Sequence, residues 1–242
     1  MKNFLTAFII IPGLLFFVAC KKDNSALAPQ SEKLVTQKVN KPSAPTRVKT
    51  EISNYASKTY YYNADLNSLG YTGSLSATYS YPDALHIIEA GAAVLETHYD
   101  LNKKGLIEKG INTNSDIYYL YNSKNQLTER FIQGHDGDID VLIYIYKDGN
   151  LDSLKSFAGD ILSSYQTFTY YTDKPNVLNN ETFGEAFRGA ESKNLLKSST
   201  FHGFNDTQVR DYSYSFDALG RVTTKSNTIN GNPEFNFAYT YY

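Results

Sequence analysis

Apolar and polar side chains alternate along most of the chain beyond residue 52. Ile117, Tyr119 and Tyr121 occupy every second position of one run, and the run 235–241 places Phe or Tyr at every second position. The run 139–146 is apolar at both odd and even positions. Because successive residues of a strand point to opposite faces, these patterns predict β-strands, with the 139–146 strand covered on both sides.

Turn-forming residues interrupt the runs at short intervals and favour the positive φ angles of tight hairpin turns. They are Lys104-Gly105, Asp136-Gly137, Asp148-Gly149, Leu219-Gly220 and Asn230-Gly231. Short turns join strands that are neighbours in the sequence, so the chain predicts an antiparallel meander. We expect an all-β domain over 52–242, with hairpin repeats forming a curved sheet that is either an open half-barrel or a two-layer sandwich.

One segment, near 173–199, breaks this pattern. It begins with Pro175, Asn176 and Asn179, and residues 185–197 are compatible with a short helix. We therefore expect an irregular or helical insertion. We expect this insertion to cover an edge of the sheet rather than to carry the function directly.

A repeat accompanies the strands. An aromatic residue ends a strand, a turn-forming polar residue follows, then Gly or Asn, then Leu or Val; 216–223 is the fullest copy. The aromatic positions are 99, 121, 146, 171, 216 and 241, with spacings of 22, 25, 25, 45 and 25 residues. A unit of that length fits one hairpin.

The copy at 216–223 resembles the YD repeat of Rhs-type cell-surface proteins. Over most of 60–242 the chain is similar to exported lipoproteins of unknown function that have YD-like hairpins. The likeness includes the segment 192–195 (Ser-Lys-Asn-Leu) and the aromatic final strand. The resemblance implies an all-β fold and an envelope location, and it supplies no catalytic residue.

The first nineteen residues read as an export signal. Lys2 precedes an apolar stretch over 4–19, which is too short to span a bilayer of ~30 Å comfortably. Residues 17–20 (Phe-Val-Ala-Cys) resemble the lipobox of bacterial lipoproteins, which implies acylation of Cys20 and attachment to a membrane through that lipid. Lys21 follows in place of the Asp that marks inner-membrane retention, so we expect the outer membrane. The alternative is an ordinary signal peptide with a chance cysteine.

Residues 20–51 are rich in Ser, Ala, Pro and Lys, and we expect a flexible basic tether. It is either a solvated spacer or a segment that rests on an anionic membrane surface. Residues 1–19 contain one charged residue, Lys2. Their loss leaves 22 basic and 25 acidic residues, a net charge of −3. This balance gives no electrostatic basis for binding nucleic acid.

Motifs for chemistry are weak. Asp136, Asp138 and Asp140 have the spacing of a calcium loop, but Val141 and Lys147 occupy the positions of its Gly and its Glu. We favour a hairpin turn there, and we expect no metal, no cofactor and no catalytic residue. Glu96 and His98 share a strand face without a visible third ligand.

Tyrosine is the residue type that best suggests binding. The chain has 21 Tyr and no Trp, and Tyr119, Tyr121, Tyr144 and Tyr146 lie on predicted strands as weak ligand-binding candidates. Aromatic stripes stack on sugars or line lipid grooves. The alternative is that these residues only stabilise the sheet as cross-strand pairs.

Three classes of function remain. We expect a lipid-anchored, non-enzymatic binding or structural protein of the envelope, periplasmic or surface-exposed, whose partner is a glycan, a lipid or an envelope protein. One alternative is a hydrolase acting on envelope glycan or lipid. The other is an outer-membrane β-barrel, since 237–242 resembles a terminal barrel strand. Against the barrel, a strand over 126–132 must point Glu129 or Arg130 toward lipid.

Overall fold

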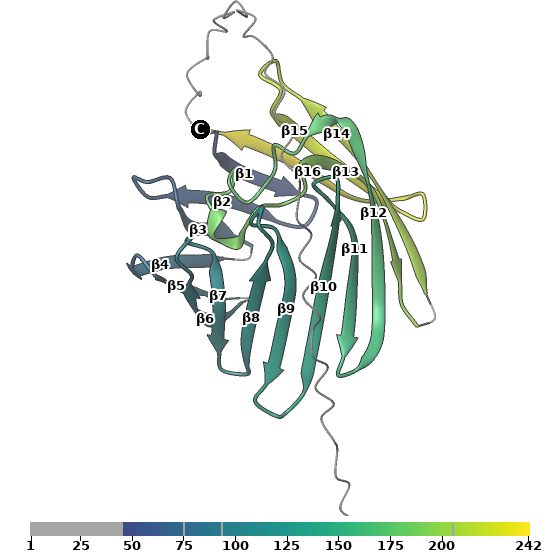
Figure 1. Cartoon of the computed structure of the whole chain (residues 1–242). Coiled ribbons are helices and arrows are strands. Elements are labelled where there is room, and N and C mark those ends of the chain that lie inside the picture. Colours follow the sequence, from purple (N-terminus) through teal and green to yellow (C-terminus); the bar gives the residue numbers. More distant parts are fainter. Residues whose placement is uncertain (1–45, 75, 93, 205) are drawn as a thin grey trace, which may run out of the picture. The chain divides into compact units, whose positions relative to one another are not determined.

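The structure, a computed structural model, describes residues 46–242 apart from 75, 93 and 205. The described residues form sixteen antiparallel strands that close into one barrel (Figure 1). The strands are β1 Val48–Ser53, β2 Ser57–Tyr62, β3 Ser68–Gly73, β4 Ala77–Asp83, β5 His86–Gly91, β6 Val94–Leu101, β7 Ile107–Asn112, β8 Ser115–Tyr121, β9 Leu127–Gly134, β10 Ile139–Lys147, β11 Asn150–Ala158, β12 Ile161–Pro175, β13 Asn194–His202, β14 Thr207–Phe216, β15 Val222–Ile229 and β16 Asn232–Tyr241.

Each strand pairs with its neighbours in the sequence, and the ends of the domain pair with each other. Thr50 of β1 faces Thr240 of β16, where the two hydroxyl oxygens lie 2.6 Å apart, and the Tyr242 N–H donates to the Arg47 carbonyl at 3.2 Å. The antiparallel meander is confirmed, whereas the open half-barrel and the sandwich are wrong. The physical reason is that β1, which lies partly in the predicted tether, supplies a partner for β16, so that neither edge stays unpaired.

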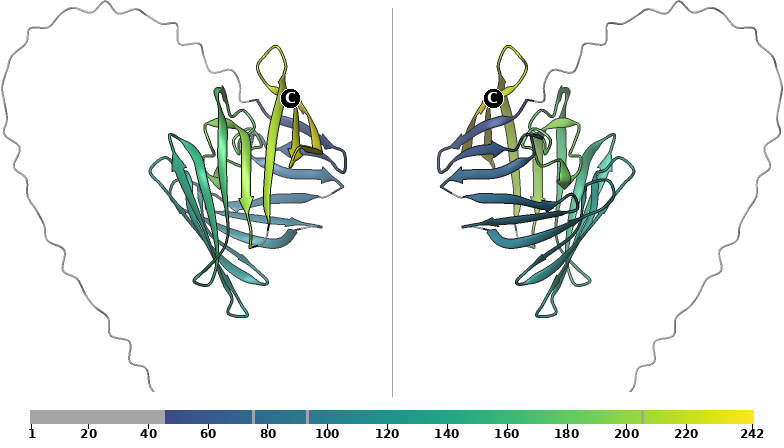
Figure 2. Two further views of the ribbon diagram at one scale, coloured as in Figure 1. Left: turned by 90° about the vertical axis from the view of Figure 1, so that its right-hand side faces the viewer. Right: turned by 90° about the vertical axis from the view of Figure 1, so that its left-hand side faces the viewer.

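The strands of the barrel change direction around its wall. In Figure 1, β2–β5 run across the view while β8–β12 run along it, and Figure 2 shows the same crossing from both sides. This is the result of strand twist and tilt accumulated around a closed sheet. Among the described residues, no helix has the length and apolar character needed to cross a membrane.

The insertion lies between β12 and β13, at residues 176–193, and we name it the cap segment. It contains one 3-10 turn, Ala186–Arg188. The expected helix over 185–197 is wrong, because residues from Asn194 onward pair with β12 as strand β13.

The cap segment lies across one end of the barrel. The Ser68 N–H donates to Gly184 O at 2.9 Å, and the Ala190 N–H donates to Asn125 O at 2.8 Å. The Lys193 N–H also donates to the carbonyl of the β10–β11 turn at 3.1 Å. Ser68 begins β3 and Asn125 lies in the β8–β9 turn, so the bonds reach well-separated parts of the rim. The cap segment therefore does not lie along an edge of the sheet.

A five-residue turn recurs at the capped end and accounts for the sequence repeat. The side-chain oxygens of Asn102, Asn122 and Asp217 each accept the N–H groups two and four residues later, at 2.9–3.2 Å. The third residue after each has a positive φ, of 74°, 61° and 76°. The turn interpretation of the repeat is thus confirmed for these three copies, although Asn102 rather than Asp100 makes the turn in the first copy. The copy at 146–151 differs, because Lys147 pairs with Asn150 and leaves a two-residue turn at Asp148 and Gly149.

A further copy begins at Asn63, where Leu66 has a φ of 63°. The sequence pattern missed it because Leu stands where Gly or Asn was expected. Membership of a YD-repeat or Rhs family stays a prediction.

Candidate functional site

The interior of the barrel is lined with tyrosines that are held by the cap segment. Phe183 of the cap segment packs on Tyr60 of β2, with ring centroids 5.2 Å apart, and Phe187 packs on Tyr79 of β4 at 5.7 Å. Tyr60, Tyr79 and Phe187 are buried. Because side chains alternate between the two faces of each strand, these contacts identify the inward-facing positions around the wall.

Arg188 anchors the cap segment to the wall. Its Nη2 donates to the Tyr79 hydroxyl and to Glu89 Oε2, both at 3.0 Å, and its Nε donates to Glu185 Oε2 at 2.9 Å. The Tyr99 hydroxyl donates to Glu89 Oε2 at 2.8 Å. One guanidinium therefore joins two carboxylates and strands β4 to β6, a strong type of charge-assisted network.

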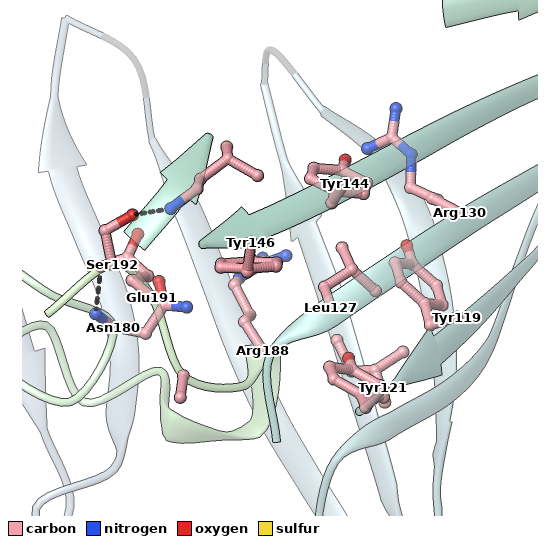
Figure 3. A pocket seen from close by; sticks show the side chains of 13 residues that line it. Tyr119, Tyr121, Leu127, Arg130, Tyr144, Tyr146, Asn180, Arg188, Glu191 and Ser192 are labelled. Carbon is pink, nitrogen blue, oxygen red and sulfur yellow. Dashed lines mark hydrogen bonds between the residues drawn. The ribbon is translucent and has the colours of Figure 1, made fainter. Parts of the chain in front are cut away.

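Beside this network lies a cavity of about 310 Å³ inside the barrel, which we name the chamber (Figure 3). Tyr119 and Tyr121 of β8 and Tyr144 and Tyr146 of β10 all line it. The four tyrosines named from the sequence are thus brought together, and their role in binding stays a prediction. The remaining lining residues are Ile107, Leu127, Arg130, Leu151, Asn180, Arg188, Ala190, Glu191 and Ser192.

The polar part of the chamber comes largely from the cap segment. Ser192 donates to the Tyr170 hydroxyl at 3.0 Å and accepts the Leu151 N–H at 2.9 Å. Glu191 accepts the Asn180 N–H at 3.0 Å. Burial raises the pKa of Glu191 above its ordinary value, and the Asn180 hydrogen bond offsets part of that effect. Sequence analysis missed these cap residues because no local motif marks them.

The raised pKa predicts a pH-dependent effect of Glu191→Gln. A raised pKa means that Glu191 stabilises the fold below its unfolded-state pKa and loses that contribution as the pH rises through the folded-state value. The variant should match the wild type near pH 4 and be slightly more stable at pH 7.5, by about 0.5 kcal/mol or about 1–2 °C in melting temperature, because solvent reaches Glu191 and screens its charge. Thermal melts followed by circular dichroism across this range measure the difference.

Glu181→Gln is the control, because Glu181 lies in the same cap segment but does not line the chamber. Its melting temperature should follow that of the wild type at every pH. Equal stabilities of Glu191→Gln and the wild type at pH 7.5 would contradict the raised pKa of Glu191.

The acidic triplet lies outside the chamber. Asp136 and Asp138 belong to the turn between β9 and β10, where Asp136 Oδ1 accepts the Asp138 N–H at 3.3 Å, and Asp140 begins the next strand. Among the residues that the structure describes, the one ion pair of His98 is with Glu96, whose Oε1 lies 2.9 Å from His98 Nε2. Within the described residues, no three His, Cys, Asp or Glu side chains gather as metal ligands would. Cys20 lies outside the described residues.

Solved structures provide the comparison. A porin-like protein from Bacteroides uniformis has a TM-score of 0.65 and 18% sequence identity, covering 83% of this chain and 99% of that chain. A porin-like protein from Bacteroides vulgatus has a TM-score of 0.60 and 13% identity, covering 81% and 98%. No family model and no curated protein matches the sequence. At these identities the likeness shows the fold, a porin-like barrel.

Proposed function

We propose that the protein is a barrel component of the outer membrane that is anchored by lipid on Cys20, stands with its outer wall in water, and binds a small molecule in its chamber. The closed barrel and its porin-like neighbours support a barrel protein of the outer membrane in place of the open sheet expected first. The lipobox at 17–20 supports the anchor.

The outer wall is the observation that carries this proposal. Lys155 lies in the middle of β11 and Asp211 in the middle of β14, and both are exposed at outward positions. Facing lipid at the membrane midplane, Lys costs roughly 2–4 kcal/mol and Asp somewhat less. Hydroxyl side chains fill most outward positions of β13 to β16: Ser198, Thr200, Ser213, Ser215, Thr224, Ser226, Thr228 and Thr240. The part of the wall formed by β13 to β16 is therefore suited to water.

The inner face supports binding. Tyrosines and apolar side chains line it, and the cap segment crosses one end of the barrel, as in a ligand-holding barrel rather than a wide aqueous channel. Of the described residues that line the chamber, Glu191 is the one carboxylate. Hydrolysis of a glycoside commonly needs two carboxyl groups flanking the bond, so binding is the better fit.

A membrane-spanning barrel is the second candidate, and one observation favours it. The outward residues of β10 are Ile139, Val141, Ile143 and Ile145, and the nearby Leu120 of β8 is 57% exposed. The sequence predicted that β10 is covered on both faces. The structure corrects this, because the odd-numbered face lies on the outer wall.

Replacing Cys20 with Ala distinguishes the two candidates. We expect the wild type to require detergent for extraction from membranes, and Cys20→Ala to appear in the detergent-free soluble fraction, because the lipid would be its only attachment. Cell fractionation combined with labelling by an alkyne fatty acid measures both properties. Ser25→Ala, in the same predicted tether, is the control and should behave as the wild type.

Two results would overturn the proposal. Label that persists in Cys20→Ala would show that lipid is attached elsewhere. A Cys20→Ala protein that still requires detergent would favour the membrane-spanning barrel.

A further inference from the structure

We infer that the chamber binds a small oxyanion, a carboxylate, sulfonate or phosphate carried on a flat apolar body, and that Arg130 binds the anionic group. This inference rests on the proposed binding role and specifies the class of ligand. It depends on the charge of Arg130, the size of the chamber and the arrangement of its tyrosines.

Arg130 points into the barrel from the middle of β9. It lies opposite Tyr119 on β8 and Leu142 on β10, at positions whose neighbours Glu129 and Phe131 point outward. In Figure 3 its side chain lies beside Tyr119 and Tyr144 at the edge of the chamber. From the sequence, either Glu129 or Arg130 had to point to the outer wall. In the structure Glu129 points outward and Arg130 points inward.

Arg130 differs from the other arginines that have carboxylate partners. Arg188 contacts Glu89 and Glu185, while Arg210 contacts Glu234 at 3.2 Å. In the part of the chain that the structure describes, no ion pair includes Arg130, and its Nε is buried without a hydrogen-bond partner. A buried donor on a permanent cation is costly unless an anion accepts from it. Guanidinium has the planar donor arrangement that matches an oxyanion.

A second cation lies in an adjoining hollow. Lys225 of β15 lines a cavity that shares Leu151, Glu191 and Ser192 with the chamber. Among the described residues no ion pair includes Lys225, so Lys225 resembles Arg130 in having no carboxylate partner. Arg188 is already paired with Glu89 and Glu185, so Arg130 and Lys225 are the cations next to the cap segment that have no carboxylate in direct contact, which favours an anion over a neutral or cationic ligand.

The rest of the chamber determines the body of the ligand. Tyr119, Tyr121, Tyr144 and Tyr146 offer ring faces and hydroxyl groups, and Leu127 adds an apolar contact. A volume of about 310 Å³ is at the lower end of the range for small-molecule pockets. A body of two or three rings therefore fits, whereas a long acyl chain or a polysaccharide does not.

Two fluorescent probes that differ in charge test the inference. 8-Anilino-1-naphthalenesulfonate carries a sulfonate, and N-phenyl-1-naphthylamine has a similar ring body without it. Both should bind the wild type. Arg130→Gln should weaken binding of the sulfonate about tenfold or more, as expected for loss of a charged hydrogen bond, and should leave the neutral probe within about twofold.

Lys155→Gln is the matched control, because it removes the same charge from the outer wall. It should change neither affinity, and the circular dichroism spectra of both variants should match the wild type. Should Arg130→Gln fail to fold, Arg130→Lys replaces it: the charge remains without the planar donors, and we expect several-fold weaker sulfonate binding. Equal sulfonate binding by the folded Arg130 variant and the wild type would overturn the role of Arg130, but not the proposal that the chamber binds a small molecule. If neither probe binds the wild type, the proposed binding function itself fails.

Discussion

Replacing Arg188 with Met should lower the free energy of unfolding by roughly 2–4 kcal/mol. The change leaves Glu89 and Glu185 without their cation, and their side chains are only 12% and 16% exposed. Met keeps most of the apolar stem that packs near Tyr79 and Tyr99, so the loss measures the charge and its hydrogen bonds. Urea denaturation followed by circular dichroism gives the difference.

A second readout locates the effect in the cap segment. Chymotrypsin should cleave next to Phe183 or Phe187 faster in Arg188→Met than in the wild type, because the cap segment loses its side-chain hydrogen bonds to β4 and β5. Arg210→Met removes a more exposed ion pair, with Glu234, and should cost about 1 kcal/mol or less. Equal denaturation midpoints for the two variants would show that Arg188 does not anchor the cap segment.

Gly70→Ala should destabilise the barrel by about 3 kcal/mol or more. Gly70 of β3 has a φ of 110°, and a Cβ atom there would lie 2.0 Å from the Ala77 carbonyl oxygen and 2.7 Å from the Thr78 Cα. Both contacts are with the backbone of β4, so they cannot be relieved by a side-chain rotation. Among the described residues, β3 and β4 pair through two residue pairs, and the substitution disrupts one of them, Gly70 with Thr78.

Gly220→Ala is the control variant, because it introduces the backbone strain of a positive φ without a steric clash of the Cβ atom. Gly220 has a φ of 76°, but a Cβ there would meet nothing within 4 Å. It should cost about 1–2 kcal/mol, the strain of a left-handed conformation alone. Thermal or urea melts of both variants measure the difference, and a Gly70→Ala variant as stable as Gly220→Ala would mean that β3 and β4 are not packed as described.

Local chemistry made the strands and turns predictable. Alternation fixed the inward and outward positions of runs such as 117–121, and Asp217 with Gly220 marked a turn whose geometry the structure confirms. The same alternation placed Tyr119 and Tyr121 on one face, which is why the tyrosines of the chamber were found.

Long-range pairing was not predictable from the sequence. The segment 48–53 (Val-Lys-Thr-Glu-Ile-Ser) reads as the end of a polar tether, because four of its six residues are charged or hydroxylated. In the barrel Val48 is fully buried and Glu51 lies inside beside Lys58, with 3.5 Å between the charged atoms. Arg130 and Arg188 were missed for a similar reason. Their environments come from strands and a cap segment far away in the chain.

Closure of the barrel also sets an order on folding. Fifteen of the sixteen ladders join strands that follow each other in the sequence, so each can form as soon as its second strand is free to pair. The ladder between β1 and β16 joins Thr50 to Thr240 across 190 residues and must wait for the last residues of the chain. Until that moment the nascent sheet has two unpaired edges, which can pair with another copy. The slowest step in acquiring the native state and the greatest hazard of aggregation are therefore the same event.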